Sequence, residues 1–331
     1  MRRTLSLLMT LLVASLATAQ PIKVVTFDET LLATLPKLAH AQVAFVDLSK
    51  SRSAPQITLT SLRGELLRSI PIPAGRFAAD WVHWGPGISY DATRRTLWYL
   101  GPKVGLTEFD MEGAVKTEIA FPKASHQIQI RPDGTLALPN SWDTADDAQV
   151  SVIDRSGKTV FQWHGRDYVN GNTTSSSVAR AQPRSFTATT SALQTESGNY
   201  FVALAQRNMI VKLNAAGVVT WKQDVAVRPH TLVVSGDELI GYSARGPNRL
   251  LLRNEACGCF KEVFLKEGAG GRDDGERTLS LQSLGKGLWF ASGVSALHII
   301  NDEGTVFWKL EHETLRGRPI GFHSAVLILQ D

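Results

Sequence analysis

Two histidines each begin a segment in which apolar and polar residues alternate. His126 opens HQIQIRPDGTLAL and His230 opens HTLVVSGDELIGYSAR, while Arg207 and Arg245 end the equivalent strands GNYFVALAQR and GDELIGYSAR. An imidazole exchanges a proton near neutral pH or attacks an electrophile, and a guanidinium group binds oxyanions. If these four side chains lie together, they form a cationic site for an anionic ligand. Alternatively, each histidine hydrogen-bonds backbone and each arginine is solvated.

The elements that would position these residues form a repeated β-hairpin. Each copy has a short apolar strand, usually Asp or Asn, then two residues, Gly and a second strand that often carries an aromatic residue. Asp or Asn caps a tight turn and Gly takes a positive φ, which is typical of hairpins. The six copies centre on Gly64, Gly113, Gly157, Gly217, Gly258 and Gly304. Their intervals of 49, 44, 60, 41 and 46 residues approximate one four-stranded propeller blade.

Further strand pairs lie between these hairpins and would form the inner half of each blade. The hairpin around Gly64 lacks an inner pair, and the C-terminal RPIGFHSAVLILQ lacks an outer pair, so the two would meet and close the ring. The sequence therefore predicts an all-β, six-bladed β-propeller over residues 41–331, with Trp163, Trp221 and Trp308 packed between blades. A two-domain α/β fold would need helical periodicity, which is found only at about 29–38.

The first residues are typical of a secretory signal peptide. Arg2 and Arg3 precede an apolar stretch, and Ala17-Thr18-Ala19 is a small-residue cleavage site. Residues 1–19 would be removed near Gln20, which leaves 20–40 as an N-terminal segment before the ring and places the protein in the periplasm or outside the cell. An uncleaved anchor is the alternative. The formal charge of +4, with Lys and Arg scattered, indicates no nucleic-acid partner.

The longest interval between hairpins contains a polar insertion at about 165–184. Its sequence, GRDYVNGNTTSSSVARAQPR, is poor in apolar residues and predicts a surface loop. The loop is either a tether or a lid that would carry Arg166, Arg180 and Arg184 over the channel mouth.

In a propeller, polar residues that begin the inner strands lie at one mouth of the central channel, where ligands usually bind. His126 and His230 take this place. His83 and His323 fall out of register, and the remaining histidines are interpreted as structural: His40, His164, His298 and His312.

Other candidate sites are weaker. Cys257 and Cys259 are interpreted as two cysteines near a turn, with a small disulfide or two thiolates for a soft metal as alternatives. Asp273 and Asp274 are one acidic pair for Ca²⁺. The glycine cluster GAGGRDDG lacks the preceding strand and following helix of a nucleotide site. No metal site is expected.

Three segments resemble the bacterial arylsulfotransferases and, more loosely, PQQ-repeat proteins: HQIQIRPDGTLALP, ALQTESGNYFVALAQRNMIVKLNAAGVVTWK and PHTLVVSGDELIGY. The resemblance implies an exported six-bladed propeller in which His126, His230 and Arg207 surround a transferred sulfuryl group as candidate catalytic residues. The family's acceptor histidine is not matched, because Thr189 or Thr190 stands near its place and threonine lacks the attacking ring nitrogen.

We therefore expect an exported, non-catalytic propeller that binds a small anion, a glycan or an envelope protein at the channel mouth or on a blade face. Its ligand-binding residues would include Arg245, Thr189, Thr190 and Arg184. Arylsulfotransferase-like sulfuryl transfer is the main alternative. A PQQ- or Ca²⁺-dependent enzyme of sugars or lactones is the second, although no cofactor is expected.

Overall fold

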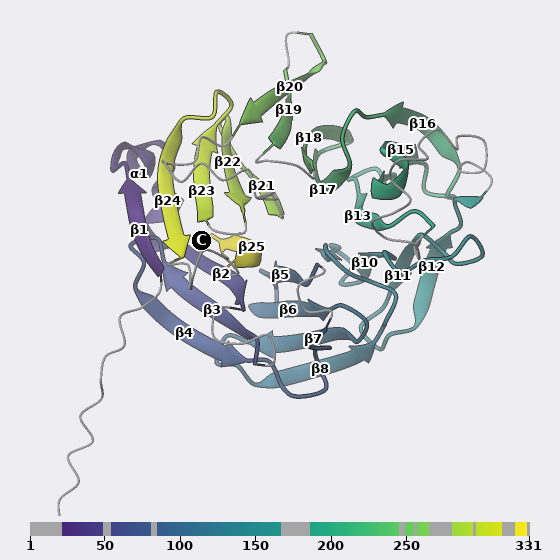
Figure 1. Ribbon diagram of the computed structural model, residues 1–331, viewed down its shortest axis with the longest axis horizontal. Helices are drawn as coiled ribbons and strands as arrows, with labels where there is room; N and C mark the ends of the chain where they lie inside the picture. Colours follow the sequence, from purple (N-terminus) through teal and green to yellow (C-terminus); the bar gives the residue numbers. More distant parts are fainter. Residues whose placement is uncertain are drawn as a thin grey trace, which may run out of the picture.

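The computed structural model describes residues 22–48, 54–80, 85–166, 186–244, 249–254, 257–264, 280–293, 296–312 and 322–329. Within these ranges nearly every element is a β-strand, and the strands form six antiparallel sheets arranged in a ring (Figure 1). The predicted six-bladed β-propeller is confirmed. No helix in the described ranges is long and apolar enough to cross a membrane, and the expected signal peptide lies outside them.

Four blades are each built from one continuous run of four strands, ordered from the channel outward. Blade 2 contains β5 (Gly87–Asp91), β6 (Thr96–Gly101), β7 (Gly105–Asp110) and β8 (Val115–Ala120). Blade 3 contains β9 (Gln129–Ile130), β10 (Leu136–Pro139), β11 (Val150–Ile153) and β12 (Thr159–Trp163). Blade 4 contains β13 (Thr189–Gln194), β14 (Tyr200–Leu204), β15 (Met209–Leu213) and β16 (Val219–Asp224). Blade 5 contains β17 (Pro229–Ser235), β18 (Glu238–Ala244), β19 (Arg249–Arg253) and β20 (Phe260–Phe264).

Blade 1 closes the ring with strands from both ends of the chain. The C-terminal strand β25 (Phe322–Ile328) pairs with β2 (Gln42–Asp47), which continues to β3 (Gln56–Ser61) and β4 (Leu66–Pro71). Closure was predicted, but the expectation that the C-terminal segment supplies both inner strands is wrong in the described residues, where it supplies only β25. The second inner strand, β2, is buried on both faces, so its sequence lacks the polar alternation that marks a strand.

Blade 6 carries an additional outer strand. Its core strands are β21 (Ser280–Gly285), β22 (Leu288–Ser292), β23 (Ala296–Asn301) and β24 (Val306–His312), and β1 (Ile22–Phe27) pairs with β24. The segment before the ring is therefore hydrogen-bonded into it. The predicted helix appears as two short helices, α1 (Thr30–Thr34) and the 3₁₀ helix η1 (Pro36–His40). Pro36 separates them because it lacks a backbone N–H and holds Leu35 outside the helical region.

The outer hairpins have the predicted turn chemistry. All six repeat glycines have positive φ. At Gly113, where φ is +96°, the Asp110 carboxylate accepts the N–H groups of Glu112 at 3.1 Å and Ala114 at 2.8 Å. In five of the turns the glycine N–H donates to the carbonyl three residues before it, whereas the Gly258 N–H donates to the Asn254 carbonyl four residues before it. The local sequence therefore predicts the place of each turn and the shape of five of them.

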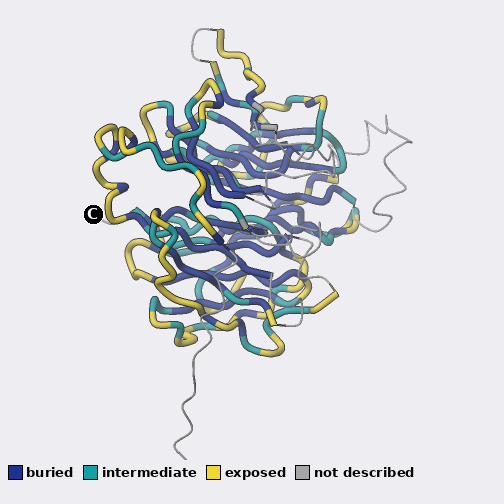
Figure 2. Tube along the Cα trace, turned by 60° about the vertical axis from the view of Figure 1, so that its left-hand side comes forward, coloured by how far each residue is buried: buried dark blue, intermediate teal, exposed yellow. Residues whose placement is uncertain are grey.

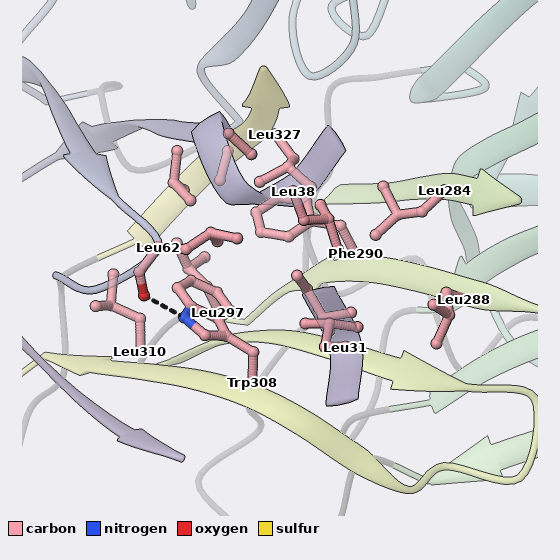
Figure 3. Close-up of a cluster of buried hydrophobic side chains, with 14 of the residues drawn as sticks. Leu31, Leu38, Leu62, Leu284, Leu288, Phe290, Leu297, Trp308, Leu310 and Leu327 are labelled. Atoms are coloured by element: carbon pink, nitrogen blue, oxygen red, sulfur yellow. Dashed lines mark hydrogen bonds between the residues drawn. The ribbon is translucent and has the colours of Figure 1, made fainter. Parts of the chain in front are cut away.

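Aromatic residues of the outer strands fill the spaces between blades in two of the three predicted cases. Trp308 lies in the core between blades 6 and 1, where its Nε1 donates to the Leu62 carbonyl at 2.6 Å (Figure 3). Trp163 packs between blades 3 and 4. The prediction for Trp221 is wrong, because its side chain is 39% exposed. Trp221 lies in register with Lys212 on the neighbouring strand, whereas Trp163 lies in register with the buried Val150.

Burial follows the blades, with buried strands inside and exposed connections outside (Figure 2). A buried ion pair also joins two blades. Arg155, in the outer turn of blade 3, binds Asp91 and contacts Glu108 at 2.7 Å, and both carboxylates belong to blade 2. Because the two carboxylates are almost fully buried, each depends on the Arg155 guanidinium for compensation of its lost hydration.

Candidate ligand site at the channel mouth

The imidazole rings of His126 and His230 lie in direct contact. Their centroids are 4.8 Å apart and the planes meet at 70°, an edge-to-face arrangement. His126 precedes β9 of blade 3, and His230 is the second residue of β17 of blade 5, so the pair reaches across blade 4. Both residues stand where their inner strands begin. The structure thus brings together two of the three residues that the sequence suggested as catalytic.

Side chains next to the histidines connect these three blades. Gln127 accepts a hydrogen bond from the Ser191 hydroxyl on β13 and donates to the Leu232 carbonyl on β17 at 3.4 Å. The Leu232 N–H donates in turn to the Ser191 hydroxyl at 3.2 Å. Each inner strand is therefore held to the next close to the ring contact, which fixes the relative position of the two imidazoles.

His126 has an unusual backbone conformation. Its φ is +78°, which is uncommon outside glycine, and its N–H donates to the Gly85 carbonyl at 2.6 Å. The ring packs directly on Gly85, where an added Cβ would lie 2.6 Å from Nε2. Gly85 therefore leaves the space that this imidazole occupies. Sequence reasoning missed Gly85 because the contact joins different blades.

Two serine hydroxyls contact Nδ1 of His126. The Ser141 hydroxyl donates its single hydrogen to the Thr189 carbonyl, so towards His126 Nδ1, 3.1 Å away, it acts only as an acceptor. The Ser125 hydroxyl lies closer to Nδ1, at 2.6 Å, and can either donate to it or accept from it. Nδ1 is therefore held by two hydroxyls from blade 3, and these contacts suit a proton on either ring nitrogen.

His230 is buried, with 8% of its surface exposed. Its Nδ1 lies 3.3 Å from the Thr231 hydroxyl, and the Thr231 N–H donates to the Ser243 hydroxyl at 3.0 Å. One of the two predicted threonines lies next to this strand, because the Thr190 hydroxyl donates to the Pro229 carbonyl at 3.1 Å. Thr190 thus makes a contact between blades 4 and 5.

Arg207 belongs to a second cluster, centred on the fully buried Asp143. The Asp143 carboxylate accepts the Thr187 hydroxyl at 2.5 Å and the N–H groups of Thr187 and Ala188. The Arg207 guanidinium lies 4.7 Å from the Phe186 ring centroid. Burial lowers the pKa of Arg207, and the charge of Asp143 opposes that shift. Its Nε is buried without a hydrogen-bond partner among the described residues.

Thr189 connects the two clusters. Its hydroxyl lies 2.7 Å from the Thr187 hydroxyl, and its carbonyl accepts from Ser141, which contacts His126. A chain of hydrogen bonds through two threonines and one serine thus connects Asp143 with the imidazole pair. Sequence reasoning found Thr189 but missed Ser141 and Asp143, because both lie in the irregular segment after β10, which carries no repeat signal.

The remaining candidates are dispersed or not described. Arg166 is exposed and bonds Asp146 at 2.6 Å. Residues Arg180, Arg184, Arg245, His83, Asp273 and Asp274 lie outside the described residues. No group of three or more histidine, cysteine, aspartate or glutamate side chains suited to a metal ion occurs in the described ranges. The cofactor expectations stay predictions.

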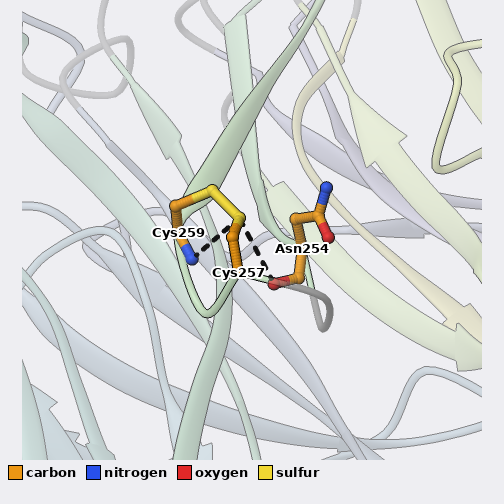
Figure 4. Close-up of a disulfide and its surroundings, with 3 residues drawn as sticks. All are labelled: Asn254, Cys257 and Cys259. Carbon is orange, nitrogen blue, oxygen red and sulfur yellow. Dashed lines mark hydrogen bonds between the residues drawn. A yellow bond between two sulfur atoms is a disulfide. The ribbon is translucent and has the colours of Figure 1, made fainter.

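Cys257 and Cys259 form a disulfide (Figure 4). The interpretation as two unbonded cysteines near a turn is therefore wrong, and the alternative of a small disulfide holds. The turn between β19 and β20 brings the two Cα atoms to 5.2 Å, a separation that a disulfide spans.

Comparisons with known proteins show the fold alone. No family model matches the chain, and no curated protein matches it. A protein of unknown function from Bacteroides caccae is similar with a TM-score of 0.61 and 13% identity, over 88% of this chain and 100% of that one. A structure of a nidogen/laminin complex has a TM-score of 0.55 and 13% identity, over 87% and 98%. The WD40 β-propeller domain of Doa1 has a TM-score of 0.53 and 13% identity, over 87% and 82%.

At 13% identity these likenesses show the propeller fold, and they do not identify a ligand or a reaction for this chain. None of the sequence comparisons connects the chain with arylsulfotransferases or PQQ-repeat proteins. That resemblance stays a prediction.

Proposed function

We propose that the protein is an exported β-propeller that binds a small oxyanion at the channel mouth, with His126 and His230 as its direct ligands. The contact between the two imidazole rings carries this proposal. Two side chains from non-adjacent blades meet close to the start of two inner strands, and propellers usually bind ligands at a mouth of the channel that inner strands line. The alternative, that each histidine only hydrogen-bonds backbone, gives no reason for the rings to meet.

Protonation of the pair would make it a site for an anion. A protonated imidazole carries an N–H on both ring nitrogens, and Nδ1 of His126 is already held by two serine hydroxyls, so Nε2 is the nitrogen that would donate to a ligand. An anion beside the pair stabilises such an imidazolium and receives a charge-assisted hydrogen bond from it. Binding near neutral pH is therefore coupled to proton uptake, and affinity rises as the pH falls through the histidine range.

Backbone strain also supports a functional role. His126 at φ +78° and Ala188 at φ +45° are non-glycine residues in the left-handed region. Such conformations persist where the surrounding structure enforces them, and they cluster at binding and catalytic sites. Asp143 enforces the one at Ala188 by accepting its N–H at 3.2 Å.

Arg207 takes a supporting role in this proposal. It balances the charge of Asp143, which holds Thr187 and Ala188, and these residues lead into Thr189. The prediction that Arg245 and Arg184 also bind the ligand concerns residues outside the described ranges.

Calorimetric titration tests the proposal. Sulfate, phosphate and a chromogenic aryl sulfate are titrated at neutral pH in buffers of different ionisation enthalpy, which reports the protons taken up. We expect binding with proton uptake, and a loss of affinity of at least about tenfold in His126→Gln and His230→Gln, the size of one charge-assisted hydrogen bond. His164→Gln is the matched control, because His164 is exposed on blade 3. Unchanged affinity in both site variants, or no binding of any anion, would refute the proposal.

A turnover assay separates binding from catalysis. Aryl sulfate with a phenol acceptor is incubated with the wild type and both site variants. If the wild type releases phenol and the His126→Gln variant does not, the protein is a sulfuryl transferase, with the Nε2 lone pair as the candidate nucleophile. Binding without turnover supports the non-catalytic propeller. Binding of a glycan or an envelope protein that is insensitive to both variants would place the ligand site elsewhere.

A further inference from the structure

The disulfide occupies the tip of an exposed hairpin. Cys257 and Cys259 lie in the turn between β19 and β20, both are exposed, and the hairpin projects beyond the ring (Figure 1). Figure 4 shows the two sulfur atoms on one side of the turn, beside Asn254. Access is one requirement for a disulfide that reacts with other thiols.

The fold does not depend on this bond for closure of the turn. The Asn254 N–H donates to the Cys259 carbonyl at 2.8 Å, and the Gly258 N–H donates to the Asn254 carbonyl at 2.8 Å. Strand pairing continues directly from Arg253 and Phe260. The disulfide spans a sequence separation of two, and the entropy that a crosslink removes from the unfolded chain is smallest for the shortest loops. Its contribution to stability is therefore small.

The two sulfur atoms have different surroundings. The Cys259 N–H donates to Cys257 Sγ at 3.4 Å. A backbone N–H stabilises negative charge on the sulfur that accepts it. Cys257 is therefore the better leaving group when a nucleophile attacks Cys259 Sγ.

We propose that Cys257 and Cys259 form a thiol–disulfide exchange site that accepts two electrons from low-molecular-weight thiols. A substrate thiolate attacks Cys259 Sγ, forms a mixed disulfide with it and releases Cys257 as the thiolate. A second substrate thiolate attacks the substrate sulfur of the mixed disulfide and releases Cys259. Two substrate thiols are thereby oxidised to one disulfide, the protein disulfide is reduced to two thiols, and the substrate protons pass to the two cysteine thiolates.

Thiol counting on the folded full chain tests the proposal, because the sequence contains no other cysteine. The oxidised protein is incubated with reduced glutathione at about 5 mM, and free thiols are trapped with a maleimide that adds mass. We expect two labelled cysteines without denaturant, and a thermal unfolding midpoint that is the same before and after reduction. A disulfide that persists in glutathione, or a reduction that unfolds the protein, would overturn the proposal.

Single variants test whether the substrate thiolate attacks Cys259 and releases Cys257. Cys259→Ser leaves only Cys257, and Cys257→Ser leaves only Cys259. We expect the thiol of Cys257 to be alkylated several-fold faster at neutral pH, because its thiolate accepts a backbone N–H. We also expect Cys257→Ser to trap a stable mixed disulfide with oxidised glutathione. Equal alkylation rates, or no mixed disulfide, would contradict the mechanism. The double serine variant gives the background for both measurements.

Discussion

Acid should destabilise the propeller through one buried histidine. His298 lies on β23 with none of its surface exposed, and both ring nitrogens lack a partner among the described residues. Burial, aided by the charge of Lys309 opposite it on β24, lowers the pKa of His298 from 6.5 to about 3. Glu311 contacts the Lys309 ammonium at 2.6 Å. The native protein therefore keeps this imidazole neutral where the unfolded chain protonates it.

The magnitude follows from proton linkage. Above the unfolded pKa of 6.5 the group contributes no pH dependence. As the pH falls towards about 3, the unfolded chain binds a proton that the native state excludes, which costs about 1.4 kcal/mol per pH unit. At a pH of about 5 the free energy of unfolding should have fallen by about 2 kcal/mol through His298 alone. Aspartates in the hairpin turns, such as Asp110, have a pKa lowered from 3.8. They therefore become protonated at a lower pH than the range in which His298 acts.

Urea unfolding followed by tryptophan fluorescence measures this effect in the wild type and in His298→Leu. The leucine removes the titrating group and two buried polar atoms, so we expect no loss of stability at a pH of about 7.5 and about 2 kcal/mol less acid destabilisation at about 5. His164→Gln, at an exposed position, should keep the wild-type pH dependence. Equal pH dependence in the wild type and His298→Leu would refute the reasoning.

Three further substitutions test other parts of the structure. Arg155→Met leaves two carboxylates of blade 2 buried without their cation, and urea unfolding should show a loss of about 3–5 kcal/mol. Trp308→Phe removes the bond from the indole N–H to a buried carbonyl and should cost about 1–3 kcal/mol in the same assay. Gly85→Ala places a Cβ against the ring of His126 and should abolish anion binding measured by calorimetry, while Gly75→Ala shares the positive φ without any neighbour and should keep binding. Anion affinity in Gly85→Ala equal to that of the wild type would contradict the described position of the His126 ring.

The sequence predicted the parts of the fold that local chemistry determines. The turn around Gly113 needs only Asp110 and a residue with positive φ, and the two are separated by only two residues in the sequence. Strands β1 and β2 escaped prediction, because their partners β24 and β25 lie near the other end of the chain. Pairings at such separation depend on ring closure rather than on the local pattern.

The candidate site was predictable only in part for the same reason. Aligned blades place His126 and His230 at equivalent ends of their inner strands, so their convergence followed from the repeat. Asp143 and Ser141 lie in a connection that no other blade repeats, so nothing in the sequence predicted their contacts with Thr187 and His126. Arg207 follows an equivalent strand, but a 3₁₀ turn directs it to the Asp143 cluster.

The most direct test of the account is the protonation of the histidine pair, observed with imidazoles labelled with ¹⁵N. Spectra recorded without a ligand give the reference signals of both imidazoles. Sulfate should then move the nitrogen signals of His126 and His230 together towards the imidazolium form, and leave those of exposed His40 and His164 unchanged. A sulfate titration that moves neither signal would contradict the proposed anion site.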